Sequence, residues 1–339
     1  MNELYPIKFT PQLKEKIWGG QHLKEFLNKP LPKNKTIGES WEISGVEGSI
    51  SVAENGFLQG NNLQELIEIY MGDLVGDRVY DQFGIEFPLL IKFIDANDVL
   101  SIQVHPDDQL AKERHNAFGK TEMWYIVHAR ENATLISGFN KKIDQTIYTQ
   151  HLASNELPKI LNYEKVKQGD VFFIPSGRVH AIGKGIVLAE IQQTSDITYR
   201  IFDWNRKDDQ GKLRELHTDL ALDAIDFTVY DHYKTSYNLK INNETKVLNC
   251  KYFHTNIIHF NQPMEKDYNQ LDSFVVYLCI EGKFIIHYTK NNNIMIQKGE
   301  TVLIPAVFEH LSLEPVEESK ILEIFIPEAG NESNKKKKN

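Results

Sequence analysis

Two stretches of the chain repeat one spacing of glycine, proline and histidine. GDVFFIPSGRVH ends at His180 and GETVLIPAVFEH ends at His310, each with five residues between glycine and proline and four between proline and histidine. Upstream of each, VVYLCIEG at 275–282 parallels MWYIVHAR at 123–130. Short apolar runs that end at glycine or proline are typical of strands. A repeat of this length predicts two homologous β-sandwich domains.

The two copies differ in their polar residues. Matching Tyr277 to Tyr125 places Phe274 where the first copy has Glu122, and nothing upstream in the second copy resembles the QVH of the first. We therefore expect the second copy to keep the fold without the polar side chains. In that case His310 is a structural or surface histidine.

The length of 339 residues also favours two domains. The sequence predicts a catalytic domain over residues 1–235, with N-terminal strands and short helical insertions, and a degenerate second domain over 236–328. The remaining residues, 329–339, form a polar tail with four consecutive lysines, which we expect to be a disordered, solvated end.

Composition narrows the class of protein. No apolar run approaches the length that spans a bilayer, and the N-terminus lacks the apolar segment of a secretory signal. The two cysteines, Cys250 and Cys279, lie in apolar runs and are expected to be buried free thiols. From these features we expect a cytoplasmic protein that does not bind a membrane. The net charge of −9 argues against binding of nucleic acid. An anionic substrate would need locally placed cations.

The stretch LSIQVHPDD, from Leu100, predicts half of a metal site. Gln103 and His105 are two residues apart on a predicted strand, so their side chains point to the same face. Ile102 and Val104 then face the opposite way, into apolar packing.

Two further strands supply the other candidate ligands. Gln103 and Glu122 offer oxygens, and His105 and His180 offer nitrogens, all from strand positions that can face one interior. Such a set suits zinc, iron, copper or nickel, and the absence of thiolate argues against a purely structural zinc. The alternative is that both histidines are satisfied core residues.

Gly169, Pro175, Gly177 and His180 match the second cupin motif, a jelly-roll signature. The larger pattern resembles type I phosphomannose isomerase, also called mannose-6-phosphate isomerase, in its shorter bacterial form. The matching segments are KIWGG, IGESWEIS, FPLLIKFIDA, LSIQVHPDD, GKTEMWY, GDVFFIPSGRVHAI, the Ser195-Asp196 turn, TYR and RELH. The resemblance covers essentially the whole chain except the lysine tail.

This resemblance implies a mainly β chain of two cupin (jelly-roll β-sandwich) domains with short helical insertions. It also implies an aldose–ketose isomerase that interconverts mannose 6-phosphate and fructose 6-phosphate through an enediol. One zinc ion per chain is expected, with another divalent metal possible. The expected partner is a small phosphosugar, and the expected assembly is a monomer or a homodimer.

The resemblance also assigns roles to residues. The implied metal ligands are Gln103, His105, Glu122 and His180. Arg200 is implied as a catalytic arginine that stabilises the enediolate. Ser101, Lys120 and Arg206 are implied as the groups that meet the phosphate or act as active-site cations.

The proton-transferring base stays open at this point. Glu190 matches a glutamate proposed for that role, but it could equally be a carboxylate that orients a histidine ligand. Lys120 is the rival base. The chain departs from the long form of the family at Arg206, where that form has lysine, and at Thr121, where it has proline. The long form's helical insertion before the histidine strand is reduced here.

Two other functions fit a cupin with these residues. Two histidines and one carboxylate are typical of non-haem iron oxygenases, although Gln103 and the Arg200–Arg206 pair speak against one. A cupin that binds sugar without turning it over is the non-enzymatic alternative. Oxygen consumption would support the first, and sugar binding without product the second.

Overall fold

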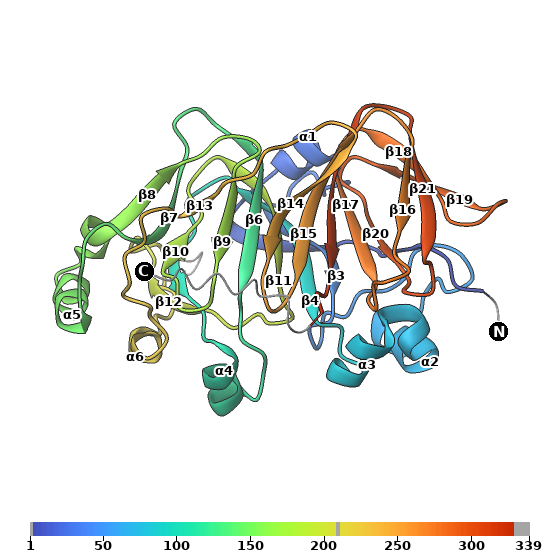
Figure 1. The fold of residues 1–339 in the computed structure, drawn as a ribbon. Helices are drawn as coiled ribbons and strands as arrows, with labels where there is room; N and C mark the ends of the chain where they lie inside the picture. The colour runs from blue at the N-terminus through green and yellow to red at the C-terminus, as the bar shows by residue number, and fades with distance from the viewer. Residues whose placement is uncertain (1–2, 208–210, 329–339) are drawn as a thin grey trace, which may run out of the picture. The chain divides into compact units, whose positions relative to one another are not determined.

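The computed structural model describes residues 3–207 and 211–328 of the chain. Its contacts divide the chain into two compact units. The central unit comprises Pro11–Ser49 and Pro88–Thr235, and the C-terminal unit comprises the segment up to Thr10, Ile50–Phe87 and the chain from Ser236. Both units are built mainly from antiparallel strands (Figure 1), which confirms the predicted mainly β class. Within the described residues, no helix is both long and apolar enough to cross a membrane.

Two antiparallel sheets form the central unit. The first has the order β13-β9-β6-β11-β4-β3-β2, and the second has the order β12-β5-β10-β7-β8. The strands of the first are β2 (Gln12–Gly20), β3 (Ile37–Ser44), β4 (Leu89–Ala96), β6 (Glu122–Ala129), β9 (Val171–Ile174), β11 (Ile186–Gln193) and β13 (Lys234–Thr235). Those of the second are β5 (Ile102–Val104), β7 (Thr134–Phe139), β8 (Leu161–Lys165), β10 (His180–Ala181) and β12 (Tyr199–Phe202).

One apolar core joins these two sheets. Trp124 and Phe172 from the first sheet pack in the same cluster as Leu135 from the second. A separate cluster contains Ile102 and Val104 of β5, so these two side chains face apolar packing as the alternation along LSIQVHPDD predicts. The helices of the unit are α1 (His22–Leu27), α4 (Asp108–His115), α5 (Gln145–Ala153) and α6 (Thr218–Leu222), with a 3-10 turn, η1, at Leu157–Ile160.

The C-terminal unit repeats the two-sheet plan. Its sheets have the orders β1-β20-β17-β22-β15-β14 and β16-β21-β18-β19. The strands are β1 (Ile7–Lys8), β14 (Asn243–Asn249), β15 (His254–Phe260), β16 (Met264–Asp267), β17 (Val275–Glu281), β18 (Lys283–His287), β19 (Asn293–Gln297), β20 (Thr301–Ile304), β21 (His310–Pro315) and β22 (Ser319–Phe325). Two helices, α2 (Leu63–Val75) and α3 (Asp77–Phe83), belong to the same unit.

The compact units differ from a division by sequence position in one respect. Residues 50–87 lie in the C-terminal unit, because the ring centroid of Phe87 lies 4.6 Å from that of Phe274 and the Phe274 amide donates to Val75 O at 3.1 Å. Strand β1 also pairs with β20. The predicted division into a 1–235 domain, a 236–328 domain and a tail stays a prediction, and the tail lies outside the described residues.

The register of the second copy corrects the sequence alignment by one residue. Glu122 pairs with Ile174 across β6 and β9, and the residue that pairs with the corresponding Ile304 is Val275, not Phe274. Matching the two tyrosines was therefore wrong by one residue. Such a slip matters, because it assigns every side chain to the opposite face of the strand. An apolar residue still replaces Glu122 in the second copy. His310 is exposed, as expected for a surface histidine.

Candidate metal centre

Strands β5 and β10 bring the first two candidate ligands together. Gln103 and His180 are directly opposite each other in this antiparallel pair, and Gln103 Nε2 lies 3.2 Å from His180 Nε2. His105 follows β5 immediately, two residues after Gln103, and its ring centroid lies 4.8 Å from that of His180. The predicted spacing of glutamine and histidine therefore brings both side chains to one place.

Glu122, the first residue of β6, completes the cluster from the other sheet. Its Oε1 lies 3.2 Å from His105 Nε2, and its Oε2 lies 3.8 Å from His180 Nε2. One potential ligand atom from each of the three residues lies within 4.8 Å of the others. All three side chains are at most 1% exposed, so the site is built inside the fold rather than on its surface.

Backbone carbonyls orient both imidazoles. His105 Nδ1 lies 2.9 Å from Ile197 O, and His180 Nδ1 lies 2.8 Å from Arg178 O. A carbonyl oxygen only accepts hydrogen bonds, so each Nδ1 carries the proton and each Nε2 presents a lone pair. This arrangement is typical of histidines that bind a metal through Nε2.

The unpaired atoms of this cluster fit a divalent cation. His105 Nε2 and both carboxylate oxygens of Glu122 are buried without a hydrogen-bond partner among the described residues. A lone pair of His105 thus faces a carboxylate oxygen at 3.2 Å, which is unfavourable unless a positive charge lies between them. Burial and the charge of Lys120 lower the pKa of His105 to about 3, so this imidazole is neutral at neutral pH.

Lys120 is the cation nearest to the cluster. Its Nζ lies 3.2 Å from Glu122 Oε1, and it is 5% exposed. Burial by itself raises the pKa of Glu122, but Lys120 and His105 outweigh it and lower that pKa well below its usual value. The carboxylate is therefore charged and available as a ligand.

Glu190 lies beside the metal cluster on β11, but its partners are not the histidines. Its Oε1 is 2.8 Å from Lys92 Nζ, and its Oε2 accepts a hydrogen bond of 2.7 Å from Trp124 Nε1. Burial, together with the charge of Glu122, raises the pKa of Glu190. These contacts do not favour a role in orienting a histidine ligand.

The sequence reading missed the partners of Lys92. Its Nζ also lies 3.8 Å from Glu39 Oε2, and the same carboxylate oxygen accepts a 2.6 Å hydrogen bond from Trp41 Nε1. Lys92 is thus a buried cation between two carboxylates, Glu39 and Glu190. A single lysine in the apolar strand FPLLIKFIDA was a signal for such pairing, because a buried charge needs a partner.

Arg200 and Ser101 also lie close to Gln103 in the fold. Arg200 on β12 is directly opposite Gln103 of β5, and its Nη1 donates to Glu215 O at 2.9 Å. Ser101 is buried and directly precedes β5. Strand β5 therefore carries Gln103, directly follows Ser101, and pairs with β12, which carries Arg200.

Arg206 is held in a second cluster. Its guanidinium pairs with Asp203 and donates to Val99 O, and Arg214 pairs with the same carboxylate. Burial would raise the pKa of Asp203, but the two arginines lower it. One carboxylate thus balances two guanidinium groups, and the cluster keeps one net positive charge. The sequence reading did not find Arg214.

Comparison with known proteins identifies the family. The family "Phosphomannose isomerase type I, catalytic domain" matches residues 7–121, and "Mannose-6-phosphate isomerase, cupin domain" matches residues 243–318. The chain is 36% identical over 307 residues to the mannose-6-phosphate isomerase ManA of Bacillus subtilis, covering 87% of this chain and 93% of the relative. It is 42% identical over 220 residues to the mannose-6-phosphate isomerase of Streptococcus mutans, covering 65% and 67%.

A solved structure gives the same result. The mannose 6-phosphate isomerase of Bacillus subtilis superposes with a TM-score of 0.84 at 32% identity, covering 94% of this chain and 99% of that one. A structure described as "a putative mannosephosphate isomerase from Archaeoglobus fulgidus" shares the fold, with a TM-score of 0.76 at 21% identity. Together with the buried histidine and glutamate cluster, these likenesses show that the chain belongs to the type I mannose-6-phosphate isomerase family.

Proposed function

We propose that the chain interconverts mannose 6-phosphate and fructose 6-phosphate at the centre formed by His105, Glu122 and His180. The reaction is proposed from the family. The location of the active site is supported by one observation. Two imidazoles and a carboxylate bring buried ligand atoms within 4.8 Å of one another, and His105 Nε2 and both oxygens of Glu122 have no hydrogen-bond partner among the described residues. This set of donors suits zinc. Gln103 is the proposed fourth ligand, through its amide oxygen.

A divalent metal bound there would supply positive charge for the enediolate that forms during proton transfer between the first two sugar carbons. The protein residues have separate parts in this proposal. The Arg200 guanidinium stays protonated and stabilises the same developing charge. Arg206, Lys120 and the Ser101 hydroxyl hold the phosphate, so that the sugar keeps one register relative to the base.

Glu190 is the proposed base. Its raised pKa brings it closer to the operating pH than an ordinary glutamate, as suits a group that takes and returns a proton. Lys92 and Trp124 hold its carboxylate in one orientation. Lys120 stays the alternative base, since it is also buried and lies beside Glu122.

The test combines metal analysis with a coupled assay on mannose 6-phosphate. We expect the zinc-loaded protein to be active and His180→Ala to lose both the metal and the activity. His151→Ala, on the separate helix α5, is a matched histidine control and should keep both. An inactive zinc-loaded protein, or a fully active His180→Ala variant, would contradict the proposal.

Zinc as the physiological metal, the cytoplasmic location and the assembly as a monomer or a homodimer are part of the same proposal. Metal exchange followed by the coupled assay tests the first. Light scattering of the purified protein tests the last.

A further inference from the structure

One turn, at residues 175–178, contacts the segments of three of the four candidate metal ligands, His105, Glu122 and His180. The amide of Gly177 donates to His105 O at 2.9 Å, and the carbonyl of Arg178 lies 2.8 Å from His180 Nδ1. The amide of Ser176 donates at 3.3 Å to the hydroxyl of Thr121, the residue before Glu122. We call this segment the 175–178 turn. A displacement of the turn would therefore disturb His180 directly and the other two ligands through their backbones.

A buried arginine belongs to this turn. Arg178 is 5% exposed, and its guanidinium carbon lies 4.3 Å from the ring centroid of Tyr230 and 4.8 Å from that of Tyr233. Its Nη1 donates to the Ser137 hydroxyl at 3.4 Å, and Ser137 lies directly opposite His180 on the neighbouring strand. Burial removes the guanidinium from water, which is unfavourable unless other groups replace the lost interactions. Here the two tyrosine rings and the Ser137 hydroxyl replace them and hold the side chain in one position.

The two tyrosines are themselves fixed to the same turn and sheet. The Tyr230 hydroxyl donates to Asp226 at 2.8 Å, and the amide of Asp226 donates to Gly177 O at 2.8 Å. The Tyr233 hydroxyl donates at 3.1 Å to the carbonyl oxygen of Phe139, the last residue of β7. The segment from Asp226 to Tyr233 thus contacts the turn through the Asp226 amide and through both tyrosine rings.

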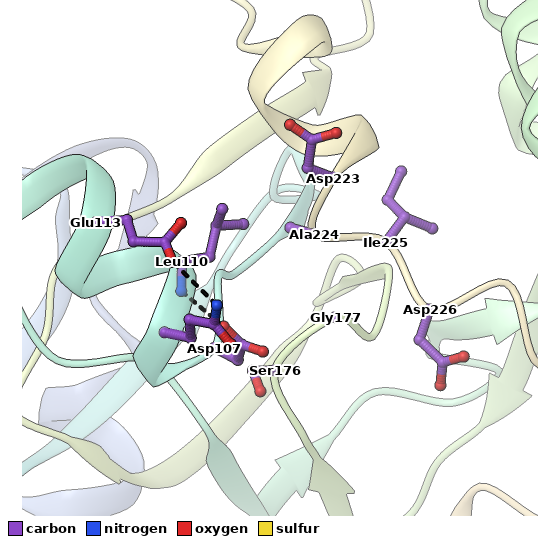
Figure 2. Close-up of a pocket in the computed structure, with 10 residues that line it drawn as sticks. Asp107, Leu110, Glu113, Ser176, Gly177, Asp223, Ala224, Ile225 and Asp226 are labelled. Atoms are coloured by element: carbon purple, nitrogen blue, oxygen red, sulfur yellow. Dashed lines mark hydrogen bonds between the residues drawn. The ribbon is translucent and has the colours of Figure 1, made fainter.

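The outer side of the turn lines a pocket of about 410 Å³. Figure 2 shows Ser176 and Gly177 of the turn together with Asp226 and the end of helix α6 in this pocket. Gly177 has a φ of +85°, and a Cβ there would lie 2.9 Å from Ala224 O. The pocket is lined by Asp107, Gln109, Leu110, Glu113, Ser176, Gly177, Asp223, Ala224, Ile225 and Asp226, none of which is a candidate ligand. Ser176 and Gly177 of the turn thus line this pocket, while the Arg178 carbonyl contacts His180.

We propose that Arg178 is a positioning residue of the metal centre. Its guanidinium, which lies over the rings of Tyr230 and Tyr233, fixes the 175–178 turn so that the Arg178 carbonyl accepts a hydrogen bond from His180 Nδ1–H and leaves Nε2 free for the metal. The inference rests on the proposed function for the metal-binding role of His180. The positioning of the imidazole itself does not depend on that role.

The first test is the affinity of the protein for zinc, measured by competition with a chelator. We expect Arg178→Met to bind zinc about 10- to 100-fold more weakly, which is the usual effect of removing a group that orients a histidine ligand. Arg114→Met removes another arginine of the same unit, with its ion pair to Asp223, and should leave zinc affinity unchanged.

Thermal unfolding separates positioning from general stability. Arg178→Met and Arg114→Met are compared at temperatures where both are folded. If Arg178→Met is folded and binds zinc with wild-type affinity, the proposal is overturned. If Arg178→Met does not fold, Arg178→Lys, which keeps the charge but loses the planar stack, decides the question. Weaker zinc binding by the lysine variant supports the proposal, and unchanged binding overturns it.

The second test needs no metal and no activity. Nitrogen NMR of the metal-free protein, at a pH above neutrality, reports which nitrogen of His180 carries the proton. We expect Nδ1–H in the wild type and a mixture of both tautomers in the Arg178 variant. A single Nδ1–H tautomer in both proteins would overturn the proposal. If the wild type binds no zinc, the proposed function fails, and the tautomer measurement still decides the role of Arg178.

Discussion

Glu190 Oε1 lies 2.8 Å from Lys92 Nζ, and both side chains are buried. Trp124 donates its indole N–H to the other oxygen of Glu190, just as Trp41 donates to Glu39 on the far side of the lysine. The result is one cation between two carboxylates, each fixed by a tryptophan. Burial would lower the pKa of Lys92, but the two carboxylates outweigh burial and raise it. The lysine is therefore charged in the folded protein.

Lys92→Met should destabilise the fold strongly. Removing one partner of a buried ion pair leaves the other charge uncompensated, which typically costs about 3–5 kcal/mol. Urea unfolding measures the loss. Adding Glu190→Gln to Lys92→Met should restore part of it, because the second change removes one of the stranded charges. The exposed Lys112→Met is the control and should stay within about 0.5 kcal/mol of the wild type. A Lys92→Met variant as stable as this control would contradict the prediction.

Glu190→Gln tests the identity of the base. If Glu190 takes the proton, kcat should fall by about 10²–10⁴-fold while zinc content stays unchanged, since backbone carbonyls orient both histidines. Loss of zinc with the activity would instead indicate that Glu190 supports a metal ligand.

The pH profile separates Glu190 from Lys120. A base works only when deprotonated, so activity falls as the pH drops through its pKa. Because burial raises the pKa of Glu190, the acidic limb of kcat/KM in the wild type should lie above the ordinary range of a glutamate. This limb should disappear in Glu190→Gln. Its persistence in the residual activity of that variant would favour Lys120.

Strand alternation could predict one part of the site, the shared face of Gln103 and His105 in the candidate ligand cluster. Gln103 and His105 share a face because a strand has a period of two residues, and Ile102 and Val104 pack on the opposite side. The spacing of the cupin motif placed His180. Both patterns involve only residues that are near one another in the sequence, so they can be recognised without knowing how distant strands pair.

The remaining features depend on register between distant strands, which local patterns do not contain. Lys92 meets Glu190 only because β4 and β11 pair in one register, and that pairing joins residues far apart in sequence. The same limit produced the slip of one residue at Phe274. Local pattern did not single out Arg178 within the motif, because the rings that it contacts, Tyr230 and Tyr233, lie about fifty residues further along the chain.

Removing the metal should abolish the activity reversibly. We expect dialysis against a chelator to inactivate the protein and added zinc to restore it. Gln103→Leu should weaken zinc binding by roughly tenfold or more, the range seen when groups that support a metal site are removed. Gln109→Leu, on helix α4 outside the cluster, is the matched glutamine control and should bind zinc normally. Normal zinc affinity in Gln103→Leu would remove Gln103 from the ligand set.

The stability of the fold in acid should depend on Glu39. Burial would raise the pKa of this carboxyl, but Lys92 and Lys16 outweigh it and lower the pKa to about 2, from an ordinary value of 4.5. The folded state therefore favours the charged form of Glu39 more strongly than the unfolded chain does. The stability that this provides is fully present above pH 4.5 and is lost as the pH falls from 4.5 toward 2.

Glu39→Gln removes this contribution. At neutral pH the variant should have a lower free energy of unfolding than the wild type, and the difference should shrink as the pH falls below 4.5. Denaturant unfolding at a series of pH values measures both curves. Glu47→Gln changes an exposed carboxylate and should alter the free energy by less than about 0.5 kcal/mol at neutral pH. A gap between Glu39→Gln and the wild type that stays constant across this range would show that the buried lysine does not hold Glu39 in its charged form.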